Sequence, residues 1–473
     1  MKHTYFRTFS FIISTTLAIF AGCTVKNADK EITMPEEEKT EYQPTLADQE
    51  MDFAYGALYF FYLDAEKALM DYEFYQGKGE EAGYSPNRFE YPDIYYMYDQ
   101  MGDNYTYYVG PYYAEMFGFS NTSEQSLDLG IQVEMLAPDS LTETRWLVTQ
   151  VYKGAPADQA GLLAGDTILL VGSTNPRDES AFVKMTSGNA GDEIPLKVAR
   201  GGSTVDVTAT LFCYLAPTVF LSYKDSVPVI KITEFAEQTA MACSDVTDDF
   251  HGTALEFENF LKATKGPVVI DLRGNLGGDI SQCVETSRAT LTKGDKMFNM
   301  KSTDFSEDST QQQIYYDEFI AEKDGIGKGR YYVLMADSFS ASCSEMMMLA
   351  MTTALKTPIV GELSLGKGIG QYYLSTPAHG YSVVTAMKIY DLDGNSYHDL
   401  GFIPDYEIAD SLEALNKAVA LAKEGKAKRT HGYGTQSLDH FTNTFAKKAG
   451  QGIRAPKSGA YKIIKNLQLK QAN

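Results

Sequence analysis

The chain has 473 residues, of which 44% are hydrophobic and 22% are charged. This balance is typical of a globular protein, and the length exceeds what one hydrophobic core usually organises, so we expect two or three domains. The formal net charge of −22 argues against a nucleic-acid-binding protein, because contacts to phosphates need clustered Lys and Arg.

Residues 1–22 have the features of a signal peptide. Lys2 and Arg7 precede an apolar run, residues 9–20, which is too short to span a bilayer comfortably. The run ends in Phe20-Ala21-Gly22-Cys23, which resembles the cleavage site of a bacterial lipoprotein. A plain secretory signal with an incidental cysteine is the alternative.

Cys23 is therefore the expected lipidation site, and its acyl chains would anchor the protein stably. Residues 23–43 are polar and rich in Glu and Lys, so we expect a lipidated flexible tether. Together these features predict an exported protein that is lipid-anchored to the cell envelope and faces the periplasm or the surface. Thr24 replaces the aspartate associated with inner-membrane retention, which favours the outer membrane.

Residues 44–120 are expected to form a small N-terminal helical domain. Apolar residues recur at helical spacing from Thr45 to about Met70, and a tyrosine-rich segment follows up to Phe119. Tyrosine buries a large ring and keeps a polar tip, so packing within this domain is the simpler explanation. A peptide-binding wall is the alternative.

Residues 121–213 are predicted to form short strands separated by turns. The expected strands are residues 129–133, 146–151, 166–171, 194–198 and 205–209. A short helix, started by Pro156 and ended by Gly161, lies between the second and the third strand.

This region resembles a PDZ domain of the bacterial protease type. The likeness lies in Leu129-Gly130-Ile131, in Ala155-Pro156-Ala157, and in Ala160-Gly161-Leu162 followed by Gly165-Asp166. PDZ domains bind an extended peptide C-terminus by strand addition, with backbone N–H groups holding the carboxylate. The resemblance implies that Leu129, Gly130 and Ile131 form the peptide-binding carboxylate loop; the alternative is that these glycines only make turns.

From residue 214 to residue 424 strands alternate with helices, which is typical of an α/β layer. The expected strands are residues 227–232, 267–272, 331–335 and 358–361, and the expected helices are residues 238–263, 342–355 and 410–423. The remaining tail, residues 425–473, is basic and glycine-bearing, and the sequence assigns no fold to it.

Ser342 lies in Ser340-Ala341-Ser342-Cys343-Ser344-Glu345, after a predicted strand and at the start of a predicted helix. At this edge open α/β sheets place their ligands, and helix N-terminal amides favour an oxyanion. The alternative is structural, because Ser342 and Glu345 also fit a Ser-x-x-Glu capping box.

Two glycine-containing turns accompany this serine. Residues 273–279, Arg-Gly-Asn-Leu-Gly-Gly-Asp, follow a predicted buried strand and would let backbone N–H groups approach a substrate. They lack the fingerprints of a phosphate-binding loop. Lys367 lies in Gly366-Lys367-Gly368, and it can act as a base only if burial or nearby charge lowers its pKa from about 10.4 toward 7–8.

Together the motifs resemble the C-terminal processing peptidases, also called tail-specific proteases, which combine a PDZ domain with a Ser/Lys site. Five family motifs have counterparts here. The motif Ser-Ala-Ser-Ala-Ser-Glu corresponds to residues 340–345, and Phe-Gly-Lys-Gly-x-x-Gln corresponds to residues 365–371. The others are Asp-Leu-Arg-x-Asn-x-Gly-Gly at residues 271–278, Gly-x-x-Pro-Asp at residues 401–405 and Asp-x-Tyr-Thr at residues 103–106. The resemblance implies an α/β core of the crotonase/ClpP-like type, residues 214–424, with an inserted, mostly-β PDZ domain and a small N-terminal helical domain.

The resemblance also implies a role for each matching residue. Ser342 would attack the scissile carbonyl, Lys367 would accept its proton, and Gln371 would orient the lysine amine. The amides of Gly278 and Cys343 would stabilise the oxyanion, with Gly277 as a competitor of Gly278. No cofactor is implied.

Cys343 departs from the family pattern, which has alanine at this position. We expect its side chain to point away from the oxyanion as a small apolar group, and a thiol nucleophile in place of Ser342 is the alternative. Cys213, Cys243 and Cys283 are too widely spaced for a CxxC metal pattern, and the sequence allows disulfides without pairing them. No HExxH is present, so no metal site is expected.

The expected function is a serine-type endopeptidase that cleaves exported proteins near their C-termini by a Ser/Lys dyad, after the PDZ domain binds the free C-terminus. Its partners would be protein or peptide substrates with exposed C-termini and, through the lipid, the membrane. One alternative is a catalytically silent protein of the same fold that binds peptides or apolar ligands. Another is a Ser/His hydrolase that uses His379 or His398.

Overall fold

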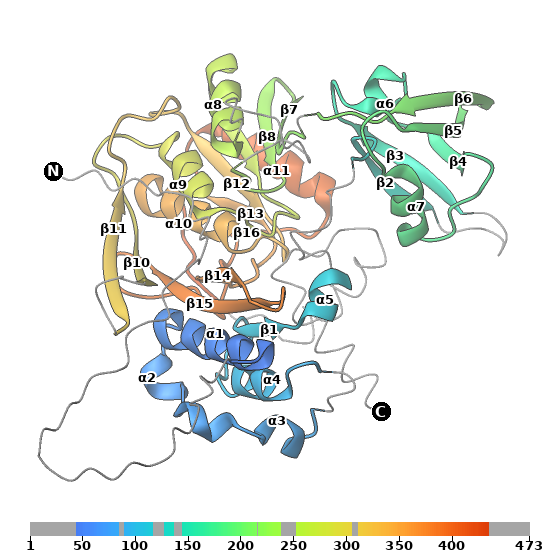
Figure 1. Cartoon of the computed structure of the whole chain (residues 1–473). Coiled ribbons are helices and arrows are strands. Elements are labelled where there is room, and N and C mark those ends of the chain that lie inside the picture. The colour runs from blue at the N-terminus through green and yellow to red at the C-terminus, as the bar shows by residue number, and fades with distance from the viewer. Residues whose placement is uncertain are drawn as a thin grey trace, which may run out of the picture. The chain divides into compact units, whose positions relative to one another are not determined.

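The computed structural model describes residues 44–84, 89–116, 127–136, 144–214, 216–237, 252–304 and 311–434. The expected signal peptide, Cys23 and the expected tether fall outside these residues. So do residues 238–251 of the expected helix 238–263 and the tail after residue 434. The described residues include three β-sheets with associated helices (Figure 1).

The central sheet has six strands in the order β16-β13-β12-β9-β8-β7. They are β7 (Val219–Lys224), β8 (Val227–Ile232), β9 (Val268–Asp271), β12 (Tyr332–Ala336), β13 (Ile359–Gly361) and β16 (Tyr406–Glu407). All neighbours from β8 to β16 pair in parallel, and β7 pairs antiparallel with β8. Every residue of β9 and β12 is buried, which explains why these two strands have continuous apolar sequences.

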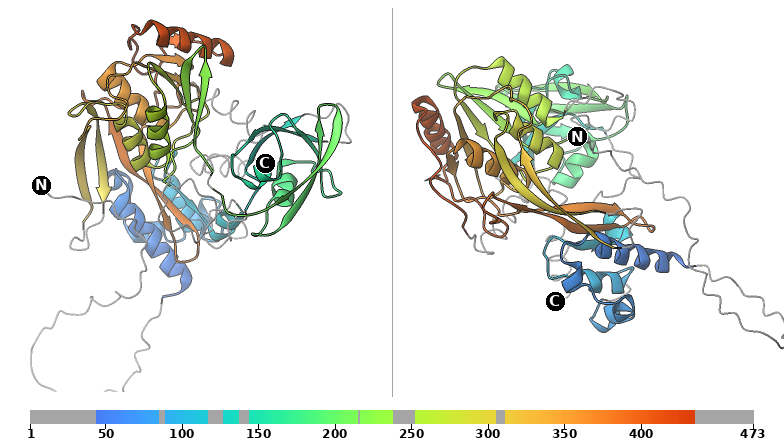
Figure 2. Two further views of the ribbon diagram at one scale, coloured as in Figure 1. Left: turned by 90° about the horizontal axis from the view of Figure 1, so that it is seen from above. Right: turned by 90° about the vertical axis from the view of Figure 1, so that its left-hand side faces the viewer.

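Helices cover both faces of this sheet (Figures 1 and 2). One face packs against α8 (Thr253–Ala263), α9 (Ile280–Arg288) and α10 (Cys343–Leu355), and the other packs against α11 (Ser411–Glu424). Every residue of α10 from its start to Thr352 is buried, so this helix passes through the core. By contrast α11 is amphipathic, and its N-cap Asp410 accepts the N–H groups of Leu412 and Glu413.

A second sheet is antiparallel and has the order β1-β15-β10-β11, with β14 paired to β15. Its strands are β1 (Tyr107–Val109), β10 (Lys296–Asp304), β11 (Gln313–Ile320), β14 (Ile369–Ser375) and β15 (Tyr381–Tyr390). β14 begins two residues after Lys367, and β1 begins two residues after Tyr105. This sheet therefore brings the segment before β1 to the lysine loop.

The N-terminal region is helical up to β1. It contains α1 (Leu46–Phe61), α2 (Ala65–Ala68), the 3-10 helix η1 (Tyr72–Tyr75), α3 (Lys78–Glu81) and α4 (Pro92–Asp99), and α5 (Pro111–Met116) follows β1. Its tyrosines pack mainly on one another, as in the edge-to-face contact of Tyr95 with Tyr108. Buried Glu50 of α1 accepts the Tyr108 hydroxyl at 2.5 Å and the Ala378 N–H at 2.7 Å, which ties these helices to the second sheet.

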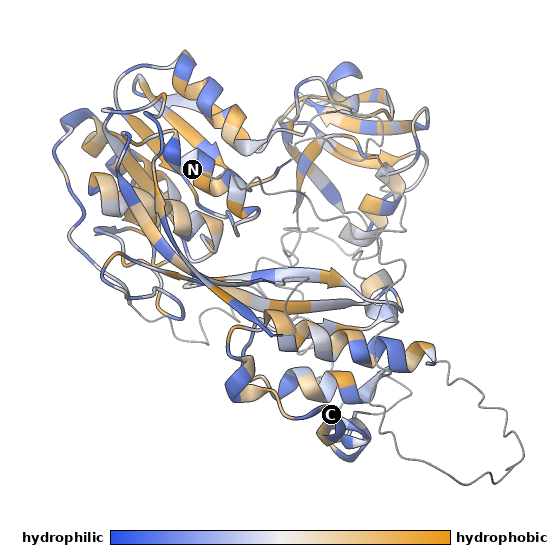
Figure 3. Ribbon diagram, turned by 60° about the vertical axis from the view of Figure 1, so that its left-hand side comes forward, coloured by the Kyte–Doolittle hydropathy of each residue, from blue (hydrophilic) through white to orange (hydrophobic). Residues whose placement is uncertain are grey.

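The third sheet belongs to the predicted PDZ region and has the order β2-β3-β4-β5-β6. Its elements are β2 (Ile131–Leu136), β3 (Arg145–Val151), α6 (Pro156–Gln159), β4 (Thr167–Val171), α7 (Glu179–Thr186), β5 (Glu193–Arg200) and β6 (Ser203–Thr210). Trp146 stacks on Phe182 of α7 in its core. The central strands of the α/β core are largely hydrophobic, whereas the strands of the PDZ region alternate hydrophobic and hydrophilic residues and show both colours (Figure 3).

Candidate active site

Ser342 is the N-cap residue of α10 and follows the loop after β12. It is half-buried, and its backbone has φ 54° and ψ −117°, a conformation that a residue with a Cβ adopts only when the surroundings hold it. The preceding loop supplies that hold, because Ser340 Oγ donates to the Leu272 carbonyl at 2.9 Å and the Ala341 N–H donates to the Asn275 carbonyl at 3.0 Å.

The glycine turn after β9 lies directly against Ser342. A Cβ added to Gly277 would lie 2.7 Å from the Ser342 Cβ and 3.0 Å from the Cys343 nitrogen, and Gly277 has φ 109°. Only glycine therefore permits this approach. The turn is fixed by Asn275, which is fully buried and donates through Nδ2 to the Ile232 carbonyl.

The three candidate oxyanion amides differ in their hydrogen bonds. The Gly277 N–H donates to Asn275 Oδ1 at 2.8 Å. Within the described residues, neither the Gly278 N–H nor the Cys343 N–H donates to a protein acceptor. These two amides are thus available to a ligand, and the Gly277 amide is occupied.

Lys367 is buried, with 6% of its surface exposed. Gly366 and Gly368 let its loop approach residues 398–401, since a Cβ on Gly366 would lie 2.9 Å from the Leu400 nitrogen and one on Gly368 would lie 2.9 Å from the His398 nitrogen. Burial lowers the pKa of Lys367 to about 8, although the carboxylates of Glu345 and Asp103 act in the opposite direction.

Glu345 connects the serine and the lysine. It is fully buried, and its Oε2 accepts the Ser342 N–H at 3.1 Å and the Lys367 N–H at 2.7 Å. Its Oε1 accepts the Ser364 hydroxyl at 2.5 Å and the Gly366 N–H at 2.6 Å. Burial raises the pKa of Glu345 to about 7, and these four hydrogen bonds oppose that rise.

Gln371 lies on β14, and its side-chain amide donates to the backbone carbonyl of Tyr105 at 2.5 Å. Lys367 Nζ lies 5.6 Å from the centroid of the Tyr105 ring. Among the interactions of the described residues, Gln371 has none with Lys367, so Tyr105 is the residue that both of them contact.

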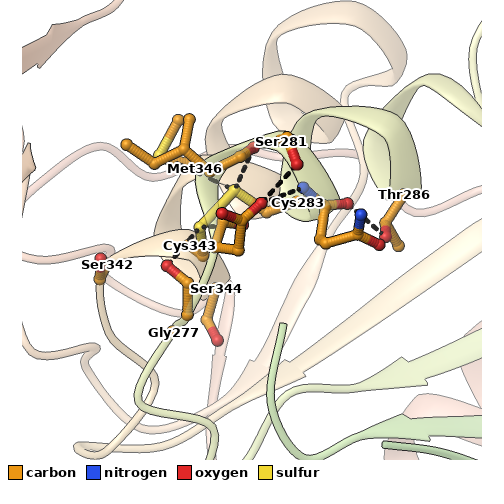
Figure 4. Close-up of a disulfide and its surroundings, with 12 residues drawn as sticks. Gly277, Ser281, Cys283, Thr286, Ser342, Cys343, Ser344 and Met346 are labelled. Atoms are coloured by element: carbon orange, nitrogen blue, oxygen red, sulfur yellow. Dashed lines mark hydrogen bonds between the residues drawn. A yellow bond between two sulfur atoms is a disulfide. The ribbon is translucent and has the colours of Figure 1, made fainter. Parts of the chain in front are cut away.

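Cys343 forms a disulfide with Cys283 of α9 (Figure 4). Both cysteines are buried. The disulfide therefore joins the helix that begins after Gly278 to the helix that begins after Ser342. The Cys343 side chain does point away from the serine, but the expectation that it behaves simply as a small apolar group is wrong, because its sulfur is bonded to Cys283. A sulfur in a disulfide cannot ionise to the thiolate that would act as nucleophile, so the alternative of a thiol nucleophile is also wrong while this bond is intact.

The predicted carboxylate loop lies at the start of β2, which is an edge strand. Leu129 is buried, and its carbonyl accepts the Ala157 N–H at 2.9 Å. Gly130 has φ 67°, and a Cβ there would lie 2.3 Å from the Ala155 Cβ. The Gly130 N–H donates to Asp128 Oδ1 at 2.8 Å, and half-buried Ile131 is the first residue of the strand.

Among the described residues, neither His379 nor His398 has a hydrogen bond or an ion pair with Ser342. His379 is exposed in the turn between β14 and β15, and His398 lies behind the lysine loop with its ring 5.5 Å from that of Tyr105. In the described part of the chain no group of His, Cys, Asp and Glu side chains could hold a metal ion, and no helix has both the length and the apolar character needed to span a bilayer.

Sequence reasoning missed three features of this site. In the sequence Glu345 fitted a capping box with Ser342, and no sequence pattern indicated that its carboxylate also accepts hydrogen bonds from residues 364–367. Tyr105 lies in the recognised stretch 103–106, but that stretch had no assigned role. Cys283 could have been suspected only because its partner, Cys343, departs from the family pattern.

Comparison with known proteins defines the class of the chain. Residues 226–408 match the model of peptidase family S41, and residues 147–200 match the model of the PDZ domain. The chain thus carries an S41 peptidase domain together with a PDZ domain. This confirms the predicted family and the predicted fold class, with its α/β core, PDZ domain and N-terminal helices.

Among curated proteins the chain is similar to two proteins of Bacillus subtilis (strain 168). It is 26% identical over 330 residues to carboxy-terminal processing protease CtpA, covering 67% of this chain and 65% of CtpA. It is 27% identical over 321 residues to carboxy-terminal processing protease CtpB, covering 66% of this chain and 61% of CtpB. The matched region thus spans less than two thirds of the length of these relatives.

A solved structure agrees at the level of the fold. It is a candidate S41 protease from Bacteroides fragilis NCTC 9343, with a TM-score of 0.53 and 13% sequence identity over 82% of this chain and 99% of that chain. At this identity the likeness concerns the fold alone.

Proposed function

We propose that the protein is a serine endopeptidase that cleaves exported proteins near their C-termini, with Ser342 as nucleophile and Lys367 as general base. The observation that carries the proposal is the buried Lys367, whose pKa of about 8 leaves a usable fraction of neutral amine near neutral pH. Its loop shares the Glu345 carboxylate with the amide of Ser342.

In the proposed reaction the Ser342 hydroxyl attacks the scissile carbonyl carbon while the Lys367 amine takes its proton. The carbonyl oxygen becomes an oxyanion, which the N–H groups of Gly278 and Cys343 stabilise. We favour Gly278 over Gly277 because the Gly277 amide already donates to Asn275.

The tetrahedral intermediate then collapses. The lysine ammonium returns its proton to the leaving amine, and an acyl-enzyme remains on Ser342. Water, deprotonated by the same lysine, hydrolyses this ester and restores the serine. Gln371 would orient the lysine through its side-chain oxygen, because its nitrogen donates to Tyr105.

The PDZ domain would select the substrate. The edge strand β2 offers a site for addition of an extended peptide. The loop of Leu129, Gly130 and Ile131 would hold the terminal carboxylate after the Gly130 N–H exchanges its hydrogen bond with Asp128 for one with the peptide. This predicts that a peptide with a free C-terminus is cleaved faster than the same peptide with an amidated C-terminus.

The test uses the protein with peptides that end in apolar residues and carry a free or an amidated C-terminus. Ser342→Ala and Lys367→Met are each expected to lower kcat at least 1000-fold, whereas Lys265→Met, at an exposed lysine, retains activity. Cleavage that survives both active-site substitutions would refute the dyad. Tight peptide binding without any cleavage by the wild type would identify the silent binding protein instead, and loss of activity only in His398→Ala would favour the Ser/His alternative.

We further propose that the protein is exported and lipid-anchored through Cys23. Besides the N-terminal motif, disulfides at Cys283–Cys343 and at Cys213 support export, because disulfides persist mainly in oxidising compartments. Metabolic labelling with a fatty acid, compared between the wild type and Cys23→Ala, tests the anchor. Equal labelling of the two proteins would contradict it.

A further inference from the structure

Tyr105 lies in a short segment that the rest of the fold holds rigidly. Its N–H donates to Asp103 Oδ1 at 2.7 Å, and the Thr106 hydroxyl donates to Asp103 Oδ2 at 2.7 Å. The Thr106 hydroxyl oxygen in turn accepts the Thr385 N–H from β15 at 3.0 Å. The backbone of Tyr105 is thus fixed to the second sheet, from which β14 carries Gln371.

Three groups of the site lie against Tyr105, one at its backbone carbonyl and two at its ring. The carbonyl accepts the Gln371 side-chain amide, and the centroid of the ring lies 5.6 Å from Lys367 Nζ. The ring also packs against His398, with centroids 5.5 Å apart and an interplanar angle of 51°. Within the described residues the Tyr105 hydroxyl makes no hydrogen bond, so the ring and the carbonyl are the parts that act.

We propose that Tyr105 is a positioning residue for the general base: its carbonyl sets the Gln371 side chain, and its ring, backed by His398, keeps water from the Lys367 amine. The proposal rests on the proposed Ser/Lys function. It concerns how the lysine is kept neutral, which neither the local sequence around Lys367 nor the family motif explains.

The Tyr105 ring can affect the pKa of Lys367 in two opposite ways, by attracting the ammonium to its face and by excluding water. Glu345 and Asp103 both favour the ammonium form of Lys367, and so does the face of an aromatic ring. Burial nevertheless lowers the pKa of Lys367 to about 8, so exclusion of water outweighs all these attractions. Burial lowers the pKa of His398, although the nearby Asp399 carboxylate acts in the opposite direction. The His398 imidazole is therefore neutral in the pH range where Lys367 titrates.

Two substitutions separate the ring from the hydroxyl. Tyr105→Ala removes the ring and opens the amine to water, so the pKa of Lys367 should rise by about one or more toward its ordinary value near 10.4. Tyr105→Phe keeps the ring and should leave this pKa unchanged. His398→Ala removes the support behind the ring and should cause a smaller rise, and it serves as the second variant if Tyr105→Ala does not fold.

The pKa is measured without relying on activity. In a Ser342→Ala background, the rate at which Lys367 is labelled by an amine-reactive reagent is followed against pH by mass spectrometry. In parallel, kcat/KM of the variants that retain Ser342 is measured from pH 6 to pH 10. Tyr105→Ala should lose about tenfold of kcat/KM at pH 7 and recover it at high pH, whereas a purely structural defect would lower kcat/KM equally at every pH.

The outcomes separate this inference from the proposed function. An unchanged Lys367 pKa in folded Tyr105→Ala and in His398→Ala would overturn the role of Tyr105, and loss of activity in Lys367→Met would still support the dyad. If Lys367→Met remains active, the dyad fails, and the labelling curve still reports whether the ring controls the lysine. A rise in pKa in Tyr105→Phe equal to that in Tyr105→Ala would also overturn the role of the ring.

Discussion

The Glu345 carboxylate accepts the Lys367 N–H at 2.7 Å through Oε2, the same oxygen that accepts the Ser342 N–H at 3.1 Å. One buried atom therefore sets the spacing between the main chains of the proposed nucleophile and the proposed base. The other oxygen, Oε1, holds Ser364 and Gly366, so the whole lysine loop is tied to the start of α10.

Glu345→Gln should disrupt this connection. The amide nitrogen of glutamine cannot accept a hydrogen bond, so two of the four donors are left unpaired inside the protein. We expect the free energy of unfolding to fall by about 1–3 kcal/mol and kcat to fall roughly 10- to 100-fold. Glu413→Gln, at an exposed position on α11, is the control. Wild-type kcat and melting temperature in Glu345→Gln would show that the shared oxygen does not set the geometry.

The pH dependence of kcat/KM should report both buried groups. The base must be neutral, so kcat/KM should increase as pH rises toward about 8, the pKa of Lys367, and level off above it. Glu345 should be ionised to accept its four donors, and its pKa is raised to about 7, so the slope should become steeper below pH 7. The steeper part should vanish in Glu345→Gln, while the lysine limb should remain and move to lower pH, because the Glu345 carboxylate raises the pKa of Lys367. A profile that is flat from pH 6 to pH 9 would contradict a lysine base.

Lys367→Met should make the protein inactive and more stable. Burial of the ammonium opposes folding, as its lowered pKa shows, and methionine fills similar space without charge. We expect a gain of about 1–3 kcal/mol in unfolding free energy at pH 7. Because the pKa of the lysine is lower in the folded state, the cost is complete below about pH 8 and disappears as pH rises past the unfolded value near 10.4. The gain should therefore shrink between these pH values in denaturant titrations. A variant less stable than the wild type at pH 7 would mean that the charge is compensated.

Gly277→Ala tests the contact between the glycine turn and the nucleophile. The new methyl group would lie 2.7 Å from the Ser342 Cβ, so either the turn or the serine must shift. We expect kcat to fall roughly 100- to 1000-fold, the cost of losing one oxyanion donor, with a smaller change in KM. Gly294→Ala is the matched control, because Gly294 also has a positive φ, 93°, but has open space around it. Equal loss in both variants would assign the effect to the backbone conformation alone.

The parts of this fold that could be predicted from the sequence are those fixed by local pattern. β9 and β12 are apolar at nearly every position because helices cover both faces, and α10 could be placed because it follows a strand and a serine cap. The second sheet was not predicted. Its strands come from far apart in the chain, β1 pairing with β15 across more than 270 positions, and no local pattern encodes such a pairing.

The same distinction applies within the site. Ser342, Lys367 and the glycine turn could be found because each lies in a compact motif. The reach of Glu345 to residues 19 to 22 positions away, and the meeting of Tyr105 with Gln371 over a separation of 266 residues, depend on tertiary packing. Such contacts can be recognised only after the elements are assembled.

The Cys283–Cys343 disulfide should stabilise the protein and keep the proposed oxyanion site in place. It closes a loop with a sequence separation of 60, and the loss of chain entropy in the unfolded state corresponds to about 4 kcal/mol. The double substitution Cys283→Ala/Cys343→Ala should therefore lower the unfolding free energy by a few kcal/mol. Alanine at position 343 matches the family pattern, so the site itself should survive, with kcat reduced roughly fivefold and KM nearly unchanged, because the Cys343 amide is held less firmly.

Reductant provides the second test of this disulfide. Wild-type kcat, measured well below the melting temperature with an alkylating agent to trap free thiols, should fall toward the value of the double variant. Cys213 is also disulfide-bonded, so Cys213→Ala is the control: its activity should remain sensitive to reductant, whereas the double variant should be insensitive. If instead the double variant keeps full kcat and only its melting temperature falls, the disulfide stabilises the core without positioning the amide. Sensitivity that disappears in Cys213→Ala would assign the effect to the other disulfide.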